Sequence, residues 1–319
     1  MDATGKKISI ITPSFNQAGY LEQTIQSVIG QNYSNLEYII IDGGSSDNSP
    51  EIIKKYERHI AYWVSETDTG QSHAINKGLE KATGDIIAWI NSDDQYLPGA
   101  LKTVSNYFSR NPEIDLIYGN AVNLYPNGKT KNYIVKEFDP VDLLSRVSVH
   151  QPSVFWKRGI HEEIGVLDET LNYVMDYDLW LRIFFRYKTK RVDKMLSIFR
   201  IHADSKTYYD PRELYYEKRK VISRFFNSLH DKTWKNQLIS LGLYDNNENI
   251  KYIFHPEIQN ANDFSRKIFL QYVYNCGIEE YTFGNYNKAQ YFFRKSLIFM
   301  FFKSIFFMVK NFIKNQCFR

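Results

Sequence analysis

A chain of 319 residues with 43% hydrophobic and 24% charged side chains has the composition of a globular protein, with one large domain plus an extension or two domains. Its formal net charge of +4 is small for this length, so we expect no nucleic-acid partner. The two cysteines, Cys276 and Cys317, form no metal-ligand spacing and no disulfide framework. Together with the lack of a signal-peptide pattern at the N-terminus, this predicts a cytoplasmic protein.

Short β-prone apolar runs alternate with helical patterns along the first 118 residues. The predicted strands are 7–12, 36–41, 60–64, 86–90 and 114–118. Helical spacing of apolar residues predicts helices near Leu21, at Ser49 as a cap with Pro50 in the first position, near Ala74, and from Pro98 to about residue 111. This alternation predicts βαβ units and a parallel sheet that is covered on both faces.

Polar clusters follow the first four predicted strands. They are 12–16, 42–47, 66–70 and 91–94. In a parallel sheet all four lie along one edge, where ligands of open α/β sheets bind, so we expect a site for a polar, charged ligand. The last cluster ends in Asp93 and Asp94, two adjacent carboxylates that suit a hard divalent cation bridging to substrate phosphates. A solvated turn is the alternative interpretation of this pair.

Two phosphate-binding motifs are absent from the sequence. No G-x-G-x-x-G follows the first strand, which argues against a dinucleotide fold. Gly128-Lys129-Thr130 resembles the end of a P-loop, but Asn123 stands where that motif requires its first glycine. We therefore interpret this stretch as a turn.

Residues 131–202 give a weaker pattern with four polar positions of interest. His150 is interpreted as a packed or solvated histidine, and His202 lies near another predicted strand end. Asp176 stands near the start of a predicted helix, where the helix dipole favours an acid. Asp178 and Arg182 have the i, i+4 spacing of an ion pair on a helix surface, which predicts a structural role for Asp178.

Taken together, these stretches resemble the family 2 glycosyltransferases, the inverting GT-A enzymes of bacterial polysaccharide synthesis, over residues 6–210. The resemblance rests on 10–16, 41–47, Asp68-x-Gly70, Ala74-x-Asn76-Lys77-Gly78, Gly84-Asp85, Ser92-Asp93-Asp94 and 176–182. It implies the GT-A nucleotide-diphospho-sugar transferase fold, which is α/β and Rossmann-like with a mostly parallel central sheet. The catalytic domain would be 1–212, followed by a helical C-terminal extension at 213–319.

The resemblance also implies the reaction and its residues. The donor would be a nucleotide-diphosphate sugar, a UDP-sugar in preference to a GDP- or dTDP-sugar, and the acceptor a glycan or lipid-linked sugar. Asp176 matches the catalytic base, and Asp94 matches the DXD-type motif for Mn²⁺ or Mg²⁺, with His202 as a further ligand or, alternatively, a packed histidine. The implied nucleotide-sugar contacts are Thr12, Pro13, Ser14, Asn16, Asp42, Asp68, Asn76, Lys77 and Asp93.

Two positions depart from the family pattern. The family often has two acids where this chain has Asp42-Gly43, and the second acid helps to hold the nucleobase, so the base contact is left open. The family also often has Glu-Asp where this chain has Met175-Asp176. The acidic neighbour that would tune the pKa of the base is therefore missing.

The composition shifts to Tyr, Phe, Lys and Asn from Glu213 onward. Residues 277–297 resemble a single helical hairpin of the tetratricopeptide type. Residues 296–314 are very apolar but are interrupted by Lys303 and Lys310, and so fall short of the roughly 18–20 apolar residues of a spanning helix. They predict either a helix docked on the catalytic domain or a helix lying peripherally on the inner face of the cell membrane.

Two other functions were weighed against sugar transfer. A nucleotidyltransferase would also place acids at a sheet edge, but it should carry a basic, glycine-rich loop after the first strand, and 12–16 contains no Lys or Arg. A catalytically inactive nucleotide-sugar- or glycan-binding module is the second alternative, and the presence of Asp93, Asp94 and Asp176 argues against it. The resemblance therefore implies a metal-dependent, inverting hexosyltransferase or related transferase of cell-surface polysaccharide synthesis.

Overall fold

The computed structural model describes residues 5–145, 149–203, 205, 211–246, 250–254 and 262–296. The chain divides into two units, which are considered separately. Unit 1 contains Met1–Phe138 and Ser148–Glu217, and unit 2 contains Asp139–Val147 and Lys218–Arg319. The division at 212/213 suggested by the sequence falls a few residues before the boundary between Glu217 and Lys218.

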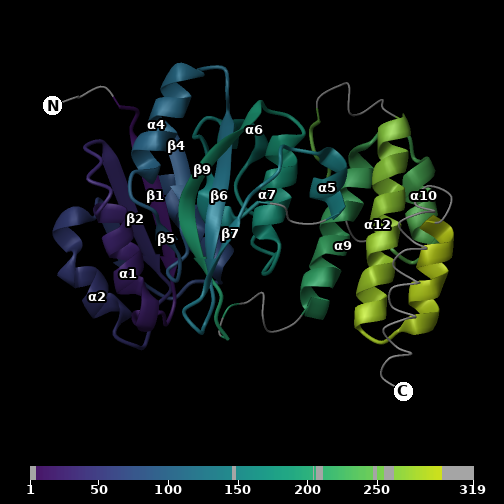
Figure 1. Ribbon diagram of the computed structural model, residues 1–319, viewed down its shortest axis with the longest axis horizontal. Coiled ribbons are helices and arrows are strands. Elements are labelled where there is room, and N and C mark those ends of the chain that lie inside the picture. The colour runs from purple at the N-terminus through teal and green to yellow at the C-terminus, as the bar shows by residue number, and fades with distance from the viewer. Residues whose placement is uncertain are drawn as a thin grey trace. The chain divides into compact units, whose positions relative to one another are not determined.

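Unit 1 is built on a mixed sheet. Its strands are β1 Ile8–Ser14, β2 Leu36–Asp42, β3 Tyr62–Ser65, β4 Ile86–Trp89, β5 Gln95–Tyr96, β6 Leu116–Leu124, β7 Thr130–Tyr133, β8 Val154–Lys157 and β9 Thr189–Arg200. The order is β3-β2-β1-β4-β8-β6-β9-β5, with β7 paired to β6 (Figure 1). The first four strands pair in parallel, whereas β8 lies antiparallel between β4 and β6. The mostly parallel, Rossmann-like arrangement is thus confirmed for the half of the sheet that ends in the polar clusters.

Five helices of unit 1 lie where the sequence predicts helices. They are α1 Ala18–Ile29, α2 Ser49–Lys55, α3 Gln71–Lys81, α4 Ala100–Arg110 and α7 Met175–Phe184. The short α6 Ile160–Ile164 is an addition to the predicted elements. Helix α3 packs on β1 and β2, and a Cβ atom at Gly78 would lie only 2.4 Å from Cγ2 of Ile11. Glycine at this position therefore lets α3 approach the sheet closely.

The predicted cap of α2 is wrong in detail. The N-cap residue is Asn48, and the backbone N–H of Ser49 donates to Oδ1 of Asp47 at 3.0 Å. The Ser49 hydroxyl instead accepts the N–H of Gln17 at 3.2 Å. A one-residue offset of this kind arises because Asp, Asn and Ser are all good capping residues and stand next to one another here.

Three buried tryptophans tie β4, β8 and α7 together. Trp89 stacks on Trp180 with ring centroids 5.4 Å apart, and Trp156 packs edge-on against both at 5.5 Å. All three are at most 1% exposed. This aromatic core fixes α7 against the strand that delivers the acid pair.

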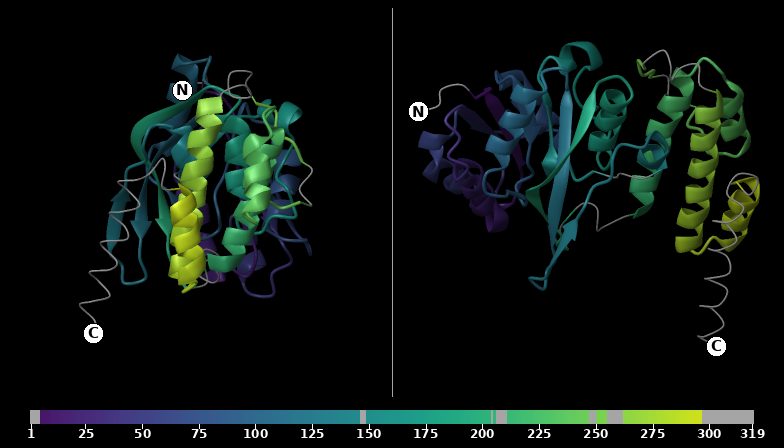
Figure 2. Two further views of the ribbon diagram at one scale, coloured as in Figure 1. Left: turned by 90° about the vertical axis from the view of Figure 1, so that its right-hand side faces the viewer. Right: turned by 45° about the horizontal axis from the view of Figure 1, so that its top comes forward.

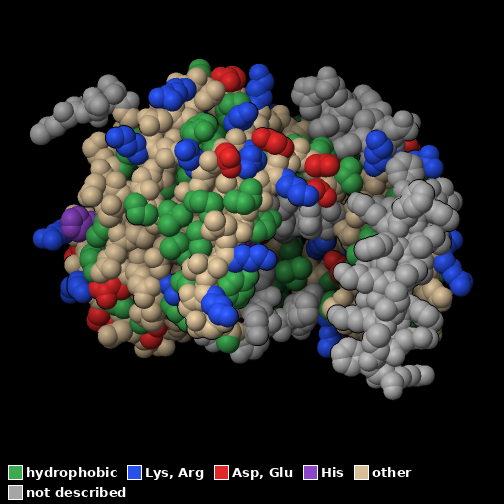
Figure 3. Space-filling model, viewed as in Figure 1, with side chains coloured by type: hydrophobic (Ala, Val, Ile, Leu, Met, Phe, Trp, Pro, Cys, Tyr) green, Lys and Arg blue, Asp and Glu red, His purple; other side chains and the backbone are tan. Residues whose placement is uncertain are grey.

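Strands β6, β7 and β9 are less covered by helices than the sequence predicts. Figure 3 shows hydrophobic side chains at the surface over β6, β7 and β9, and Val122, Leu124 and Ile198 of these strands are only half-buried. On the face shown in Figure 3, helices therefore do not cover β6, β7 and β9, whereas the sequence predicts helices on both faces of the sheet.

Unit 2 is helical in its described part. It contains α5 Pro140–Ser145, the end of α9 Pro211–Ser228, α10 Thr233–Ser240 and α12 Asn262–Thr282 (Figure 2). Aromatic rings join these helices, with Phe269 of α12 in contact with Phe226 and Trp234. After a turn at Gly284, residues 286–296 form a helix whose Phe293 packs on Tyr274, which confirms the predicted hairpin.

Within the described residues, no helix is both long enough and apolar enough to cross a membrane. The predicted peripheral helix at 296–314 lies outside the described residues apart from Ser296.

Candidate active site

The carboxyl ends of β1 to β4 enclose a cavity of about 610 Å³. Its walls are 13–15 and 17 from β1, Gly43 after β2, 67–71 after β3 and 91–94 after β4, completed by Ala74, 199–200 and 205. The prediction that the polar clusters meet at one edge is confirmed, and the structure adds the end of β9 to that edge. Pro13, Ser14, Asp68, Asp93 and Asp94, all predicted site residues, line this cavity.

The two adjacent acids differ sharply in environment. Asp94 is 1% exposed, its Oδ1 accepts the backbone N–H of Arg200 at 2.9 Å, and its buried Oδ2 has no hydrogen-bond partner. Burial, reinforced by the charge of Asp93, raises the pKa of Asp94 well above its usual range. Asp93 is more open to solvent and its Oδ2 lies 2.9 Å from Nε2 of His202. An unpartnered buried carboxylate oxygen at a cavity wall is a group that a cation would stabilise.

His202 and Arg200 come from the end of β9 and lie beside the acid pair. The His202 ring is buried and packs on Tyr20 with centroids 4.6 Å apart. The Arg200 guanidinium donates to the backbone oxygen of Asp93 at 3.0 Å and to Gln23 at 2.7 Å, and it lies 5.0 Å from the centre of the Tyr20 ring. Arg200 thus puts a fixed positive charge on the cavity wall. Arg200 is not among the residues that the sequence predicts for the site, although it stands only two residues before His202.

The donor set fits a divalent cation only in part. Two carboxylates are suitable ligands for Mn²⁺ or Mg²⁺, whereas an imidazole suits a transition metal better than Mg²⁺. In the part of the chain that the structure describes, however, no three His, Cys, Asp or Glu side chains are already grouped to hold an ion. Asp94, with its unpartnered Oδ2, therefore fits an ion that takes its remaining ligands from a diphosphate, as Mg²⁺ commonly does.

The acid at the end of β2 is occupied by its own loop. Asp42 is fully buried, and its carboxylate accepts hydrogen bonds from the backbone and hydroxyl of Ser45 and from the hydroxyl of Ser65 at 2.6–2.9 Å. It is not among the residues that line the cavity. Its observed contacts shape the loop after β2.

Asp68 occupies the space that a side chain at position 43 would take. A Cβ atom at Gly43 would lie 2.8 Å from Oδ2 of Asp68 and 3.0 Å from its Cγ. The other oxygen of Asp68 accepts the N–H of Gly70 at 2.8 Å. The missing second acid after β2 is therefore matched in space by a carboxylate that arrives from the neighbouring strand end.

Phe15 is a cavity residue that sequence reasoning missed. Its side chain is 59% exposed, although it stands at the wall of the cavity. The sequence indicates Phe15 only by placing an aromatic residue within the polar cluster 12–16. Exposed aromatic faces at a cavity wall suit the stacking of a flat, aromatic ligand group.

Four predicted contact residues have polar atoms that are engaged elsewhere. The buried hydroxyl of Thr12 lies 3.1 Å from that of Tyr38, and the Asn16 side chain accepts the N–H of Ser46. Asn76 exchanges hydrogen bonds with the backbone of Leu167 at 3.0 Å in both directions, and Lys77 pairs with Glu66 at 2.8 Å. None of the four lines the cavity.

Asp176 lies in the first turn of α7. It is half-buried, and its Oδ1 accepts the N–H of Tyr177 at 2.7 Å. Burial raises the pKa of Asp176 to about 6, against 3.8 for an ordinary aspartate. It does not line the cavity itself, but a small recess lined by Leu171 and Asn172, just before α7, shares residues 69–71 with the cavity. Met175, which stands where the family often has a glutamate, is buried.

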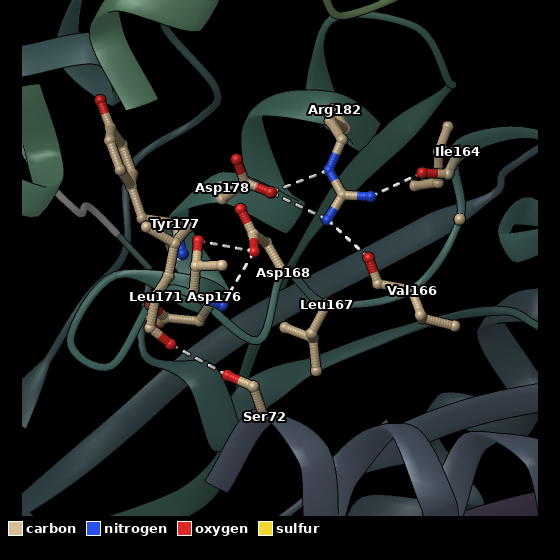
Figure 4. Close-up of polar contacts among 12 residues, drawn as sticks. Ser72, Ile164, Val166, Leu167, Asp168, Leu171, Asp176, Tyr177, Asp178 and Arg182 are labelled. Carbon is tan, nitrogen blue, oxygen red and sulfur yellow. Dashed lines mark hydrogen bonds and ion pairs between the residues drawn. The ribbon is translucent and has the colours of Figure 1, made fainter. Parts of the chain in front are cut away.

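The segment before α7 is held from both sides (Figure 4). Arg182 pairs with Asp178 at 2.9 Å and donates to the backbone oxygens of Ile164 and Val166 at 2.6 and 3.0 Å. From α3, the Ser72 hydroxyl donates to the backbone oxygen of Leu171 at 3.1 Å. The predicted pair between Asp178 and Arg182 is confirmed, but Asp178 is only 2% exposed, so the pair is buried and does not lie on the helix surface.

His150 is a packed histidine, as expected. Its ring stacks on Phe199 at 4.7 Å and contacts Tyr133 at 4.2 Å. Burial lowers the pKa of His150 to about 4, so it is neutral at pH 7. Its stacking partner Phe199 lines the cavity.

Known proteins with similar sequences are glycosyltransferases by name. An uncharacterized glycosyltransferase of Rickettsia prowazekii is 30% identical over 210 residues, which cover 63% of this chain and 65% of that relative. A Campylobacter jejuni protein named GalNAc(5)-diNAcBac-PP-undecaprenol beta-1,3-glucosyltransferase is 26% identical over 252 residues, covering 73% of this chain and 80% of the relative. The chain spans less than two thirds of the length of the rickettsial relatives.

Solved structures with a similar fold come from two further organisms. S. aureus TarS, in complex with UDP-GlcNAc, superposes with a TM-score of 0.59 at 17% identity, covering 86% of this chain and 80% of that one. The mannosyltransferase PcManGT from Pyrobaculum calidifontis, in complex with GDP-Man and Mn²⁺, gives a TM-score of 0.55 at 15% identity, covering 97% and 80%. These likenesses show the fold, which is of the GT-A type with a helical C-terminal part.

The model of the family described as glycosyl transferase family 2 matches residues 9–185. This range includes β1 apart from Ile8, the whole of β2, β3 and β4, the acid pair and the whole of α7. The chain belongs to glycosyl transferase family 2.

Proposed function

We propose that this chain is a metal-dependent, inverting glycosyltransferase that moves a sugar from a nucleoside-diphosphate donor to a glycan or lipid-linked acceptor. The observation that carries the proposal is the cavity itself, which combines the exposed ring of Phe15, the carboxylate of Asp68 and an acid pair whose Asp94 is buried, at one sheet edge. A nucleotide sugar offers a partner for each of these groups.

The order of the strands leaves room for an extended donor. The ends of β3 and β4 are three places apart in the sheet, about 14 Å at about 4.8 Å per strand. Asp68 follows β3 and its carboxylate reaches back toward Gly43, whereas Asp93 follows β4. We therefore assign the nucleoside to the side of Phe15 and Asp68, and the diphosphate to the side of Asp93, Asp94 and Arg200.

The metal would be held by Asp94 and shared with Asp93 and His202. When bound, Mn²⁺ or Mg²⁺ supplies Lewis-acid stabilisation of the negative charge that develops on the leaving diphosphate. Arg200 adds a fixed cation on the same wall, which acts on the same developing charge without needing to move.

Asp176 is assigned as the general base. A carboxylate with a pKa of about 6 is ionised at pH 7 yet basic enough to accept a proton from a hydroxyl as that hydroxyl attacks. The acceptor oxygen bonds to the anomeric carbon on the face opposite the leaving group. The bond from that carbon to the diphosphate oxygen breaks, its electron pair leaves with the nucleoside diphosphate, and the configuration inverts.

The setting is inferred from the relatives. The Campylobacter jejuni relative is named for a glucosyl transfer to an undecaprenol-linked acceptor, which supports a lipid-linked acceptor and cell-surface polysaccharide synthesis here. The TarS structure holds UDP-GlcNAc, which supports a UDP-sugar, with a GDP-sugar as the next candidate because PcManGT holds GDP-Man. Peripheral contact with the inner face of the cell membrane through residues 296–314 is part of the same proposal.

The proposal is tested by measuring melting temperature with UDP, GDP, dTDP and their sugars, with and without Mn²⁺. A donor present at one hundred times its Kd should stabilise the protein by about 2.7 kcal/mol, and only with the metal. Products are then identified with an undecaprenol-linked glycan as acceptor. Release of a nucleoside diphosphate with sugar transfer supports the proposal, release of pyrophosphate indicates a nucleotidyltransferase, and metal-dependent binding without turnover indicates an inactive module.

A further inference from the structure

The backbone that leads into α7 is held by a carboxylate from a different helix. Glu217 of α9 accepts the N–H of Asn172 through both of its oxygens at 2.8 and 3.0 Å. Its Oε2 also accepts the N–H of Tyr173 at 2.7 Å and that of Val174 at 3.3 Å. Three consecutive N–H groups thus converge on one side chain that is 43 to 45 residues away in sequence.

This contact is buried and anchors the backbone immediately before α7. Glu217 is 7% exposed, so its charge is stabilised by these N–H groups and little by water. Val174 is the N-cap residue of α7 and provides no side-chain cap of its own. Of the three N–H groups, only that of Val174 belongs to the helix start, and those of Asn172 and Tyr173 lie just before it. Glu217 thus fixes the chain where it enters α7.

We propose that Glu217 is a positioning residue for the transfer reaction, because it sets the place of the first turn of α7 and hence of Asp176. This inference rests on the proposed role of Asp176 as the base. Asp176 is two residues beyond Val174, and its own hydrogen bond is to the adjacent Tyr177, so its location follows the backbone of this turn. A base must be held to within about half an ångström of its productive geometry.

The same segment is fixed from the cavity side, so Glu217 completes a clamp. Ser72 and Asn76 of α3 bind the backbone of Leu171 and Leu167, and α3 begins at the cavity wall. Without Glu217, these contacts would hold residues 167–171 while the N–H groups of residues 172–174 lost their hydrogen bonds to this carboxylate. The acceptor side of the site would then loosen while the donor cavity stayed intact.

The test compares three full-length variants. Glu217→Gln keeps the size of the side chain but removes its charge and turns an amide donor toward backbone donors. Glu217→Asp keeps the charge on a shorter arm. Glu213→Gln is the matched control, because Glu213 is an exposed acid in the first turn of the same helix.

We measure kcat, donor Kd with Mn²⁺, and hydrogen exchange of the amides of Asn172, Tyr173 and Val174. Glu217→Gln should lower kcat by roughly ten- to hundredfold, because a displacement of about 1 Å can cost 100-fold in rate, while donor Kd stays within about twofold. Exchange at the three amides should accelerate. Glu217→Asp should recover part of the rate, and Glu213→Gln should resemble the wild type in every measurement.

A structural role without a catalytic consequence would lower only the melting temperature. Equal kcat for Glu217→Gln and Glu213→Gln in an active enzyme would overturn the inference, and so would unchanged exchange at residues 172–174. A kcat loss that matches a loss in the number of donor-binding sites would also overturn it, since it would report misfolded protein. Failure of the proposed function looks different, because the wild type itself would then transfer no sugar and Asp176→Asn would be indistinguishable from it.

Discussion

Replacing Asp176 with asparagine should separate chemistry from binding and from stability. Asparagine keeps the size of the side chain and can still accept the N–H of Tyr177, but it cannot take a proton from the acceptor. Loss of a general base costs about two to four orders of magnitude in rate, or roughly 3–5 kcal/mol at the barrier. Donor affinity should change little, because Asp176 does not line the cavity.

The stability of the same variant should move in the opposite direction. Burial raises the pKa of Asp176 to about 6, so above pH 6 the folded state holds a charge that it disfavours, whereas the unfolded chain ionises this group near 3.8. Between these pKa values the folded state binds the extra proton, and stability is lost as pH rises from about 4 to 6. The cost at pH 8 is at most about 3 kcal/mol, falling to roughly half of that at pH 5. Asparagine carries no charge, so the variant does not lose this folding stability at high pH.

Urea unfolding at pH 8 and pH 5 measures this difference, and the pH dependence of kcat/KM in the wild type should show a rising limb near pH 6. A helix-start acid with only a structural role predicts the reverse, a loss of about 0.3–1 kcal/mol at pH 8 and near-normal turnover. A transfer rate within a few-fold of wild type would remove Asp176 as the base. Lower stability of the variant at pH 8 would refute the burial argument.

Two further variants test the metal site and the C-terminal segment. Asp94→Ala should abolish transfer and metal-dependent donor binding while the protein stays folded, because it removes the unpartnered buried oxygen at the cavity wall; metal-stimulated donor binding by the variant would contradict the assignment. Truncation after Ser296, which keeps the packed Phe293, should reduce partition onto anionic liposomes because it removes an apolar stretch and Lys303 and Lys310. Equal partition of both forms would exclude an interfacial role for 297–319.

The sheet edge that forms the cavity could be predicted because its signals are local. Strands β1 to β4 are short, mostly apolar, β-prone runs that end in polar residues. Helices follow β1, β2 and β3, and α4 follows β4 after the short β5. Such runs determine the parallel order, and the parallel order brings the strand ends together. Pro13, Ser14, Asp68, Asp93 and Asp94 follow from this reasoning directly.

The remaining features depend on contacts between distant parts of the chain. Strands β8 and β9 lie in a region with mixed patterning, and β8 is antiparallel to both of its neighbours, so no βαβ signal marks it. The burial of Asp178 and the hydrogen bonds from residues 172–174 to Glu217 arise from tertiary packing, which spacing rules do not cover. Lys77 illustrates the converse, since it stands within a family motif but pairs with Glu66.

Gly43 stands where the family often has a second acid, and the structure predicts what a larger side chain would do there. Its backbone does not require glycine, because its φ is not among the positive values found at other glycines of the described chain. The requirement is for space, since a Cβ atom would lie 2.8 Å from Oδ2 of Asp68. Gly43→Ala should therefore act by displacing the Asp68 carboxylate from the cavity wall.

Because a hydrogen bond to a charged group is worth about 1.5–3 kcal/mol, both Gly43→Ala and Asp68→Ala should weaken donor binding by roughly ten- to a hundredfold. The double variant should be no weaker than Asp68→Ala alone, because the alanine at position 43 then has nothing left to displace. Gly19→Ala is the matched control, since a Cβ atom there meets nothing within 4 Å. Additive losses in the double variant, measured by donor titration, would show that the two residues act separately and that Asp68 does not replace the absent acid.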